Sequence, residues 1–228
     1  MHFAFLNHGY PDRFKVMDGL RGRLCKRRPL FAKQQREHLW KLYPVDPVEG
    51  KTVAIVGMGR VGRAVAVRLR AFGMHVIGVR NRAEPLAEAD ETLTAEHLPE
   101  ALQRADFVVL ITPLTPQTRG LFDARMLSHC KRGAYFIDLA RGNIVDEAAL
   151  RQAIASGALK GATMDVFHTE PLPVDDPMWD ADGVIVTPHV SGEVSDWQLL
   201  AARLFLDNLE RWLRGEPLRN LCDPALGY

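Results

Sequence analysis

The stretch KTVAIVGMGRVG, residues 51–62, decides the fold of this chain. It joins an apolar run, Val53 to Val56, to three glycines at G-x-G-x-x-G spacing. The apolar run is typical of a strand that is buried on both faces. The glycines allow a tight turn, close approach of a phosphate to the backbone and close packing of the next helix. We therefore expect the pyrophosphate of a dinucleotide to bind the following residues: Gly57, Gly59, Arg60, Val61 and Gly62.

The residues after the glycines fit a strand-helix-strand unit. Residues 60–72 have a helical pattern, Gly73 ends it, and residues 74–79 form the next apolar run. This context favours a dinucleotide site, because the glycine spacing alone is a weak signal. The alternative is a glycine-rich turn that binds nothing.

The rest of the chain alternates between helix-like and strand-like runs. The helix-like runs are residues 94–103, 123–129, 146–156 and 194–213, and the strand-like runs are residues 106–111, 134–138, 162–166 and 184–186. This alternation predicts an α/β fold, a doubly wound parallel sheet of the Rossmann type. The loops that follow its strands should face one crevice, and they begin at Gly57, Arg80, Thr112, Ala140, Asp165 and Thr187. In the last helix, we expect one apolar face made of Leu200, Leu204, Leu209 and Leu213.

The region before residue 51 is harder to interpret. Glycines interrupt residues 1–29, and Pro29 should end whatever precedes it. Residues 31–43 have a helical pattern that two prolines follow, which indicates a connector helix. We divide the chain into an N-terminal remnant (1–30), a connector helix and linker (31–50), a dinucleotide-binding domain (51–192) and a C-terminal helix with a tail (193–228).

Composition narrows the class of protein. The 228 residues are 47% hydrophobic and 25% charged, which is ordinary for a globular protein. The net charge of +1 divides into +5 for residues 1–30 and −4 for the remainder, without the basic clusters and interleaved aromatics of nucleic-acid binding. We expect no membrane span, no signal peptide and no metal. Three scattered cysteines, Cys25, Cys130 and Cys222, indicate neither a disulfide framework nor a zinc site, so we expect a reducing cytoplasm.

Three strand-end loops carry side chains that could perform chemistry. LARGN contains Arg141, VFHTEPLP contains Glu170, and VTPHVSG contains His189. Each alone has an ordinary explanation: a surface arginine, a solvated glutamate, or a histidine satisfied by the backbone. Together at one end of a sheet, they supply a proton donor, its carboxylate partner and a substrate-binding cation. Such a set can stabilise negative charge that develops on a reacting oxygen and can protonate that oxygen.

Five segments in this order, GMGRVG, TPLTPQT, DLARGNIVDEAAL, MDVFHTEPLP and TPHVSG, resemble the D-isomer-specific 2-hydroxyacid dehydrogenase family over about residues 31–228. The resemblance implies an NAD(P)-dependent oxidoreductase that transfers a hydride between nicotinamide and a small 2-keto or 2-hydroxy acid, as in glyoxylate/hydroxypyruvate reductases. It implies that Arg141 binds the substrate, that His189 exchanges the proton, and that Glu170 is the partner of His189. It further implies that Asp165 holds the nicotinamide carboxamide. The other residues that it implies along the dinucleotide are Thr112, Pro113, Leu114, Thr118, Leu139, Ala140, Arg141, His189 and Gly192.

The end of the second strand should decide between NAD and NADP. An acidic residue there would accept the ribose hydroxyls of NAD. The chain instead has Arg80, Asn81 and Arg82, whose cations suit a 2′-phosphate. We therefore favour NADP over NAD, although both arginines facing water would also fit the sequence.

The front of the chain departs from the family pattern. Family members carry a substrate domain ahead of the cofactor domain, and almost none of it is recognisable here. A truncated gene product, a dissected domain and a wrongly assigned start all remain open. So do two other functions, a dinucleotide-binding module without turnover and a nucleotide-sensing partner protein. We expect a homodimer, because residues 31–43 resemble the family's connector helix near its two-fold axis and the last helix is rich in apolar side chains: Leu199, Leu200, Phe205 and Trp212.

Overall fold

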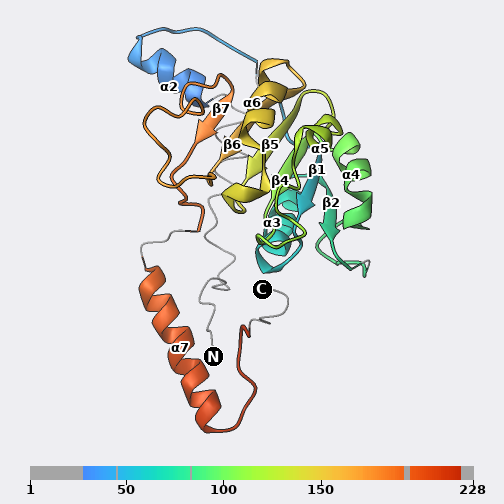
Figure 1. Cartoon of the computed structure of the whole chain (residues 1–228), viewed down its shortest axis with the longest axis vertical. Helices are drawn as coiled ribbons and strands as arrows, with labels where there is room; N and C mark the ends of the chain where they lie inside the picture. The colour runs from blue at the N-terminus through green and yellow to red at the C-terminus, as the bar shows by residue number, and fades with distance from the viewer. Residues whose placement is uncertain (1–27, 45, 83, 193–195, 222–228) are drawn as a thin grey trace.

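A seven-stranded parallel sheet forms the centre of the computed structural model, which describes residues 28–221 except 45, 83 and 193–195 (Figure 1). The expectations for Cys25, Cys222 and most of the N-terminal remnant lie outside these residues. The strands are β1 (Thr52–Val56), β2 (His75–Arg80), β3 (Glu91–Thr94), β4 (Phe107–Leu110), β5 (Ala134–Asp138), β6 (Leu159–Met164) and β7 (Val184–Val186). Their order in the sheet is β3-β2-β1-β4-β5-β6-β7, and every neighbouring pair is parallel.

Helices α3 to α6 cover both faces of the sheet. The described helices are α2 (Arg28–Arg36), α3 (Arg60–Ala71), α4 (Leu98–Arg104), α5 (Ala124–Ser128), α6 (Glu147–Ala155) and α7 (Trp197–Leu213), with two short 3₁₀ helices, η3 (Ala95–His97) and η4 (Gly142–Ile144). Helix α3 packs Val65 and Leu69 into one apolar cluster, whereas α4, α5 and α6 contribute Leu102, Leu127 and Leu150 to the other. The predicted doubly wound Rossmann fold is therefore confirmed.

Strand β1 lies between these two clusters, which explains its continuous apolar run. Val53 and Ile55 belong to the cluster of α3, while Ala54 and Val56 belong to the cluster of α4 to α6. Successive side chains of a strand point to opposite faces, so a strand covered on both sides needs apolar residues at every position. All four of these side chains are buried.

The chain reverses direction across the sheet at β1. From β1 it proceeds outward to β2 and β3, and it then returns to β4 on the other side of β1. In a parallel sheet, such a reversal opens a crevice at the carboxyl ends of the two central strands. The glycine loop after β1 and the loop after β4 lie at this crevice, where a dinucleotide would bind.

Strand β3 was missed by the sequence analysis. Residues 94–103 were expected to form one helix, but Thr94 ends β3, η3 follows, and α4 begins only at Leu98. All four residues of β3 are half-buried at the edge of the sheet, and Leu93 is its only apolar side chain. A short, polar edge strand gives no alternating pattern, and its pairing with β2 is visible only in the structure.

The connector helix is shorter than predicted and begins earlier. Helix α2 starts at Arg28, so Pro29 lies in its first turn, where proline is well tolerated. It ends at Arg36 rather than at Tyr43, and His38 has a left-handed backbone with φ 51°. The Gln34 side chain donates a hydrogen bond to the Lys41 carbonyl at 3.0 Å, which folds the following residues back on the helix.

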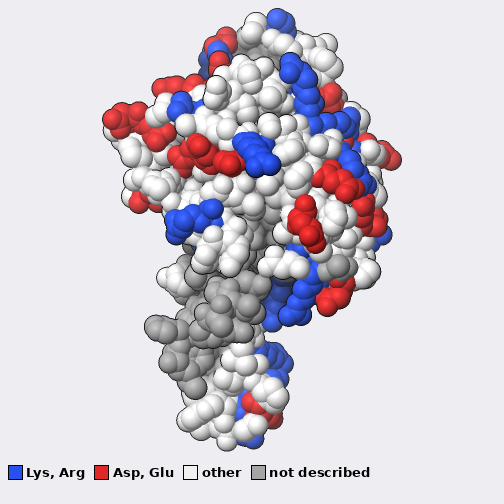
Figure 2. Space-filling view, turned by 45° about the vertical axis from the view of Figure 1, so that its right-hand side comes forward, with Lys and Arg blue, Asp and Glu red and all other residues white. Residues whose placement is uncertain are grey.

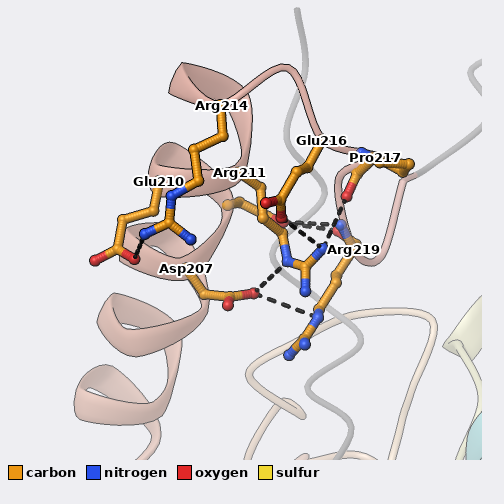
Figure 3. A network of polar contacts seen from close by, with 8 residues as sticks. Asp207, Glu210, Arg211, Arg214, Glu216, Pro217 and Arg219 are labelled. Atoms are coloured by element: carbon orange, nitrogen blue, oxygen red, sulfur yellow. Dashed lines mark hydrogen bonds and ion pairs between the residues drawn. The ribbon is translucent and has the colours of Figure 1, made fainter.

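Helix α7 stands away from the sheet at one end of the molecule (Figure 1). The predicted apolar face is wrong in part, because Leu200 is buried whereas Leu209 and Leu213 are exposed. Ion pairs also form along this helix. Figure 3 shows Asp207 bound to Arg211 at 3.2 Å and to Arg219 at 3.4 Å, which ties residues 216–219 to the helix.

Charges of both signs alternate over the face of the molecule in Figure 2. Several are paired across elements, such as Lys131 with Asp106 at 2.8 Å and Arg104 with Glu91 at 2.5 Å. Exposed pairs of this kind contribute little stability, with a median of about 0–1 kcal/mol.

Among the described helices, none has both the length and the apolar character that crossing a bilayer requires.

Candidate active site and cofactor cleft

The glycine loop has the geometry that its spacing predicted. Gly57 has φ 109°, and a side chain there would meet the Ile111 carbonyl oxygen, 2.5 Å from the Cβ position. A Cβ on Gly62 would lie 2.1 Å from the Gly57 carbonyl oxygen, whereas a Cβ on Gly59 would meet nothing within 4 Å. The first and third glycines are therefore needed by the fold. The middle one leaves open space at the crevice, which suits the approach of a phosphate.

The amino end of α3 faces this open space without a capping side chain. Gly59 is the N-cap residue and makes no side-chain hydrogen bond, so the first amides of the helix remain available to an anion. Arg60 is exposed and Val61 is half-buried at these first positions. A helix of this length also presents partial positive charge at its amino end. The loop and helix together fit the pyrophosphate of a dinucleotide.

The arginines expected to select the cofactor lie at the carboxyl end of β2. Arg80 is partly buried and has a weak contact with Glu84, with Nη1 and Oε2 3.9 Å apart, while Asn81 and Arg82 are exposed. Ion pairs to α3 hold the loop that follows. Arg63 Nε donates to Glu88 Oε1 at 2.9 Å, and Arg70 Nε lies 3.1 Å from Asp90 Oδ1.

The loop after β4 is shaped by its own threonines. The Thr118 hydroxyl donates to the Pro113 carbonyl at 2.7 Å and accepts from the Thr115 N–H at 2.8 Å. Thr112 and Leu114 are half-buried beside the crevice, and Pro113 is exposed. Thr118 thus stabilises the loop, and its contact with a cofactor stays a prediction.

The turn after β5 places Arg141 at the carboxyl edge of the sheet. The Ala140 N–H donates to Asp138 Oδ1 at 2.9 Å, and the exposed Arg141 side chain donates from Nη1 to the Ala140 carbonyl at 2.6 Å. The Leu139 N–H donates to the Leu110 carbonyl at 3.0 Å, which attaches the turn to β4. Arg141 is therefore held beside the loops of two neighbouring strands.

The Arg141 turn is packed against the loop that carries Glu170. A Cβ on Gly142 would lie 1.8 Å from the Phe167 carbonyl oxygen, so only glycine fits this contact. The His168 N–H donates to Glu147 Oε1 at 2.6 Å. These two contacts join the candidate substrate-binding turn to the candidate catalytic loop.

His189 and Glu170 form the predicted pair. Nδ1 of His189 lies 2.8 Å from Oε2 of Glu170, and the other oxygen of Glu170 accepts from the Phe167 N–H at 2.9 Å. Partial burial would raise the pKa of Glu170, but the hydrogen bonds from His189 and Phe167 and the charge of Arg141 outweigh it and lower the pKa. The carboxylate therefore stays ionised, and it leaves Nε2 of His189 available to a substrate oxygen.

Asp165 is next to His189 in the fold, because its carbonyl accepts the His189 N–H at 2.8 Å, and it is 1% exposed. Its carboxylate accepts hydrogen bonds from the Val190 N–H at 3.0 Å, the Ser191 N–H at 2.8 Å and the Thr187 hydroxyl. The carboxylate thus holds the loop after β7. The nicotinamide contact inferred from the resemblance stays a prediction, as does that of Gly192, whose Cβ position is open.

Sequence reasoning missed two acidic residues behind these loops, Asp138 and Glu147. The apolar run AYFID ends in an aspartate, and a carboxyl group at the end of a buried strand could have been recognised as a candidate functional group.

The described part of the chain has no group of three or more His, Cys, Asp or Glu side chains that could hold a metal. Burial raises the pKa of the Cys130 thiol to about 12, which leaves it unreactive.

Comparison with known proteins identifies the family. Residues 20–191 match the NAD binding domain of the D-isomer specific 2-hydroxyacid dehydrogenases. The chain belongs to this family. The resemblance inferred from the five motifs is confirmed, and the match begins inside the segment that we had treated as a remnant.

Relatives in the family include two kinds of named enzyme. The chain is 41% identical over 182 residues to glyoxylate/hydroxypyruvate reductase B of Citrobacter koseri, a match that covers 78% of this chain and 56% of the reductase. It is 38% identical over 183 residues to D-3-phosphoglycerate dehydrogenase of Mycobacterium leprae, which covers 79% of this chain and 34% of the dehydrogenase. The matched region thus spans between a third and just over half of the length of these relatives.

Solved structures of family members superpose closely. A D-isomer specific 2-hydroxyacid dehydrogenase from Xanthobacter autotrophicus Py2, in complex with NADPH and MES, has a TM-score of 0.83 and 38% identity, covering 93% of this chain and 87% of that one. An NADPH-dependent glyoxylate/hydroxypyruvate reductase from Sinorhizobium meliloti, in complex with NADP and sulfate, has a TM-score of 0.85 and 31% identity, covering 100% of this chain and 72% of that one.

Proposed function

We propose that the chain carries the cofactor site and the proton-transfer residues of an NAD(P)-dependent 2-keto acid reductase. The observation that carries this proposal is the His189–Glu170 pair, 2.8 Å apart, with Arg141 close enough for its charge to act on Glu170. The pair and the arginine come from three loops at the same edge of the sheet as the glycine loop. Relatives named as glyoxylate/hydroxypyruvate reductases support a small 2-keto acid as substrate.

The bound nicotinamide would supply the hydride, and the chain's own residues would bind and protonate the substrate. Arg141 would fix the carboxylate of the 2-keto acid with its guanidinium, which can make two parallel hydrogen bonds. As negative charge develops on the keto oxygen, Nε2 of His189 would donate a proton to it. Glu170 would hold Nδ1, which orients the ring so that Nε2 is directed to the keto oxygen.

NADP is the cofactor that we propose. Arg80 and Arg82 follow β2 without an acidic residue in the same turn. Two guanidinium groups at this position suit a 2′-phosphate. The structures from Xanthobacter autotrophicus and Sinorhizobium meliloti contain NADPH and NADP, which supports this choice. NAD remains the alternative.

An assay of NADPH oxidation with glyoxylate and hydroxypyruvate tests the proposal. We expect NADPH binding, measured by nicotinamide fluorescence, to be clear and turnover to be slow. His189 and Glu170 have side chains that are 43% and 37% exposed, and catalysis of this kind depends on excluding water and fixing the substrate. Failure to bind NADPH or NADH would contradict the proposal. Binding without any turnover would favour a silent dinucleotide-binding module.

We also propose that the chain forms a homodimer. Trp40 and Leu42, which follow α2, are 94% and 86% exposed. On α7, the exposed apolar side chains are Trp197, Leu199, Phe205, Leu206, Leu209, Trp212 and Leu213. Apolar surfaces of this kind commonly mark protein interfaces, and a second copy is the simplest occupant.

Sedimentation at micromolar concentration tests the dimer. Phe205→Glu combined with Trp212→Glu should give a monomer, because each change replaces an exposed apolar side chain of α7 with a charge. Glu210→Gln, which removes a charge from α7 without changing an apolar side chain, is the control and should leave the dimer intact. A monomeric wild-type chain would contradict this proposal.

The cytoplasmic location and the division into residues 1–30, 31–50, 51–192 and 193–228 stay predictions.

A further inference from the structure

Asp138 is a buried acid behind the Arg141 turn that the proposed mechanism does not use. It is the last residue of β5, and it is 0% exposed. One carboxyl oxygen, Oδ1, accepts the Ala140 N–H at 2.9 Å. The other, Oδ2, is buried and has no hydrogen-bond partner among the described residues. An ionised carboxylate with one oxygen unpaired in such a place would be costly.

The groups around Asp138 also disfavour a negative charge. The residues that pair with it on the adjacent strands, Leu110 of β4 and Met164 of β6, are apolar. The titratable groups that act on it are Asp165, just beyond β6, and Glu147, in the first turn of α6. Both are acids, so among the described residues Asp138 faces two carboxyl groups and no cation that acts on its pKa.

The hydrogen bonds of Asp138 are few compared with those of Asp165. The Asp165 carboxylate accepts from two N–H groups and one hydroxyl, whereas among the described residues the Asp138 carboxyl accepts only the Ala140 N–H. Few hydrogen bonds and nearby acidic groups both disfavour the charged form of a carboxyl group. Burial and the charges of Asp165 and Glu147 together raise the pKa of Asp138 to about 8, against the effect of the Ala140 N–H.

We propose that Asp138 is a positioning residue that, as a neutral acid, fixes the Leu139–Arg141 turn for the cofactor and the substrate. The chain of contacts is short, because Asp138 holds the Ala140 N–H and the Arg141 guanidinium donates to the Ala140 carbonyl at 2.6 Å. A second negative charge in the cluster would repel Asp165, which holds the His189 loop. This inference rests on the proposed function, since it assumes that the turn contacts a dinucleotide.

The pH dependence of NADPH binding tests the positioning role in the full chain. Wild-type affinity should fall as the pH rises through about 8, by no more than about tenfold per pH unit, since one proton is coupled to binding. Asp138→Asn keeps the acceptor for Ala140 and cannot ionise, so it should bind NADPH as wild type does at pH 7 without the alkaline loss. Asp138→Ala should bind more weakly at every pH, because the Ala140 N–H loses its acceptor.

The outcomes of this experiment separate the two proposals. Clear wild-type binding at pH 7 with the same alkaline profile in Asp138→Asn would overturn the positioning role and leave the proposed function intact. If the wild type bound neither NADPH nor NADH at any pH, the proposed function would be overturned and the positioning role with it.

The proton on Asp138 is tested independently by unfolding in denaturant, whether or not NADPH binds. The unfolded chain ionises this acid near its ordinary pKa, whereas the folded chain keeps it neutral. Wild type should therefore lose stability relative to Asp138→Asn as the pH rises from 5 to about 8, and the difference should level off above that. Asp106→Asn is the matched control, because Asp106 has a lowered pKa and its difference from wild type should be constant over this range. If the stability difference between wild type and Asp138→Asn were also constant over this range, the proposal that Asp138 is neutral in the folded chain would be wrong.

Discussion

Asp165 holds the backbone of His189 in an unusual conformation. The His189 N–H donates to the Asp165 carbonyl at 2.8 Å, and His189 has φ 50°, in the left-handed region that residues other than glycine rarely adopt. The Asp165 carboxylate accepts the N–H groups of the next two residues, Val190 and Ser191. Strain of this kind persists at functional sites only where the surrounding contacts enforce it. The orientation of the candidate proton donor thus depends on one buried carboxylate.

Replacing Asp165 by Asn should therefore disturb this loop. The carboxylate presents acceptors on both oxygens, but an amide would point an N–H₂ group at donors on one side. We expect a loss of about 2 kcal/mol in the free energy of unfolding, measured in denaturant. Asp123→Asn is the matched control. Asp123 caps α5 through the Met126 N–H at 2.7 Å, and Asn caps equally well, so its stability should hardly change. An equal effect of the two changes would contradict this account.

The glycines of the first loop should separate folding from cofactor binding. Gly62→Ala would force a methyl group against the Gly57 carbonyl at 2.1 Å, so it should cost at least about 1–3 kcal/mol of stability. Gly59→Ala has open space and φ −76°, so its stability should stay within about 1 kcal/mol of wild type. Both should weaken NADPH binding, because the methyl group that Gly59→Ala adds would lie where a phosphate approaches and Gly62→Ala would distort the loop. A Gly59→Ala variant with wild-type affinity would contradict that placement.

Much of the fold could be predicted because its signals are local. The apolar run of β1, the glycine spacing and the helical pattern of α6 all depend on neighbouring residues, and each occurs close to where the sequence placed it. What could not be predicted depends on distant partners. Strand β3 exists through its pairing with β2, and the residues after α2 fold back so that Gln34 binds the Lys41 carbonyl. The role of Asp165 toward residues 187–191 likewise needs contacts across more than 20 positions.

The charge of Glu170 should make a pH-dependent contribution to stability. Its folded pKa is lowered, so its bonds to His189 and Phe167 stabilise the fold above its unfolded pKa of about 4.3 and are lost as the pH falls through the lower folded value. The stability difference between wild type and Glu170→Gln should thus shrink as the pH falls from about 6 to about 3. Glu37→Gln, an exposed glutamate after α2, is the control. A difference that grows toward acid pH would show that the carboxyl is not stabilised as an anion.

The two arginines after β2 should discriminate between the cofactors. If Arg80 and Arg82 bind the 2′-phosphate, changing both to Gln removes charge-assisted hydrogen bonds worth about 1.5–3 kcal/mol each. NADPH affinity should then fall by at least about tenfold in a fluorescence titration, while NADH affinity stays nearly the same. Arg125→Gln, on α5 between β4 and β5 in the chain, is the control. Equal losses for NADPH and NADH would mean that the arginines support the loop rather than the phosphate.

His189 should be the proton donor in any turnover by this chain. His189→Ala should reduce the turnover of glyoxylate or hydroxypyruvate by about 10²–10⁴-fold, the usual contribution of a general acid. Its NADPH affinity should stay nearly unchanged, because the glycine loop and the amino end of α3 bind the pyrophosphate without the imidazole. His129→Ala, at the end of α5, is the matched control and should keep full turnover. Loss of NADPH binding together with turnover in His189→Ala would show that this residue supports the cleft as a whole, and the proton would then have to come from another group.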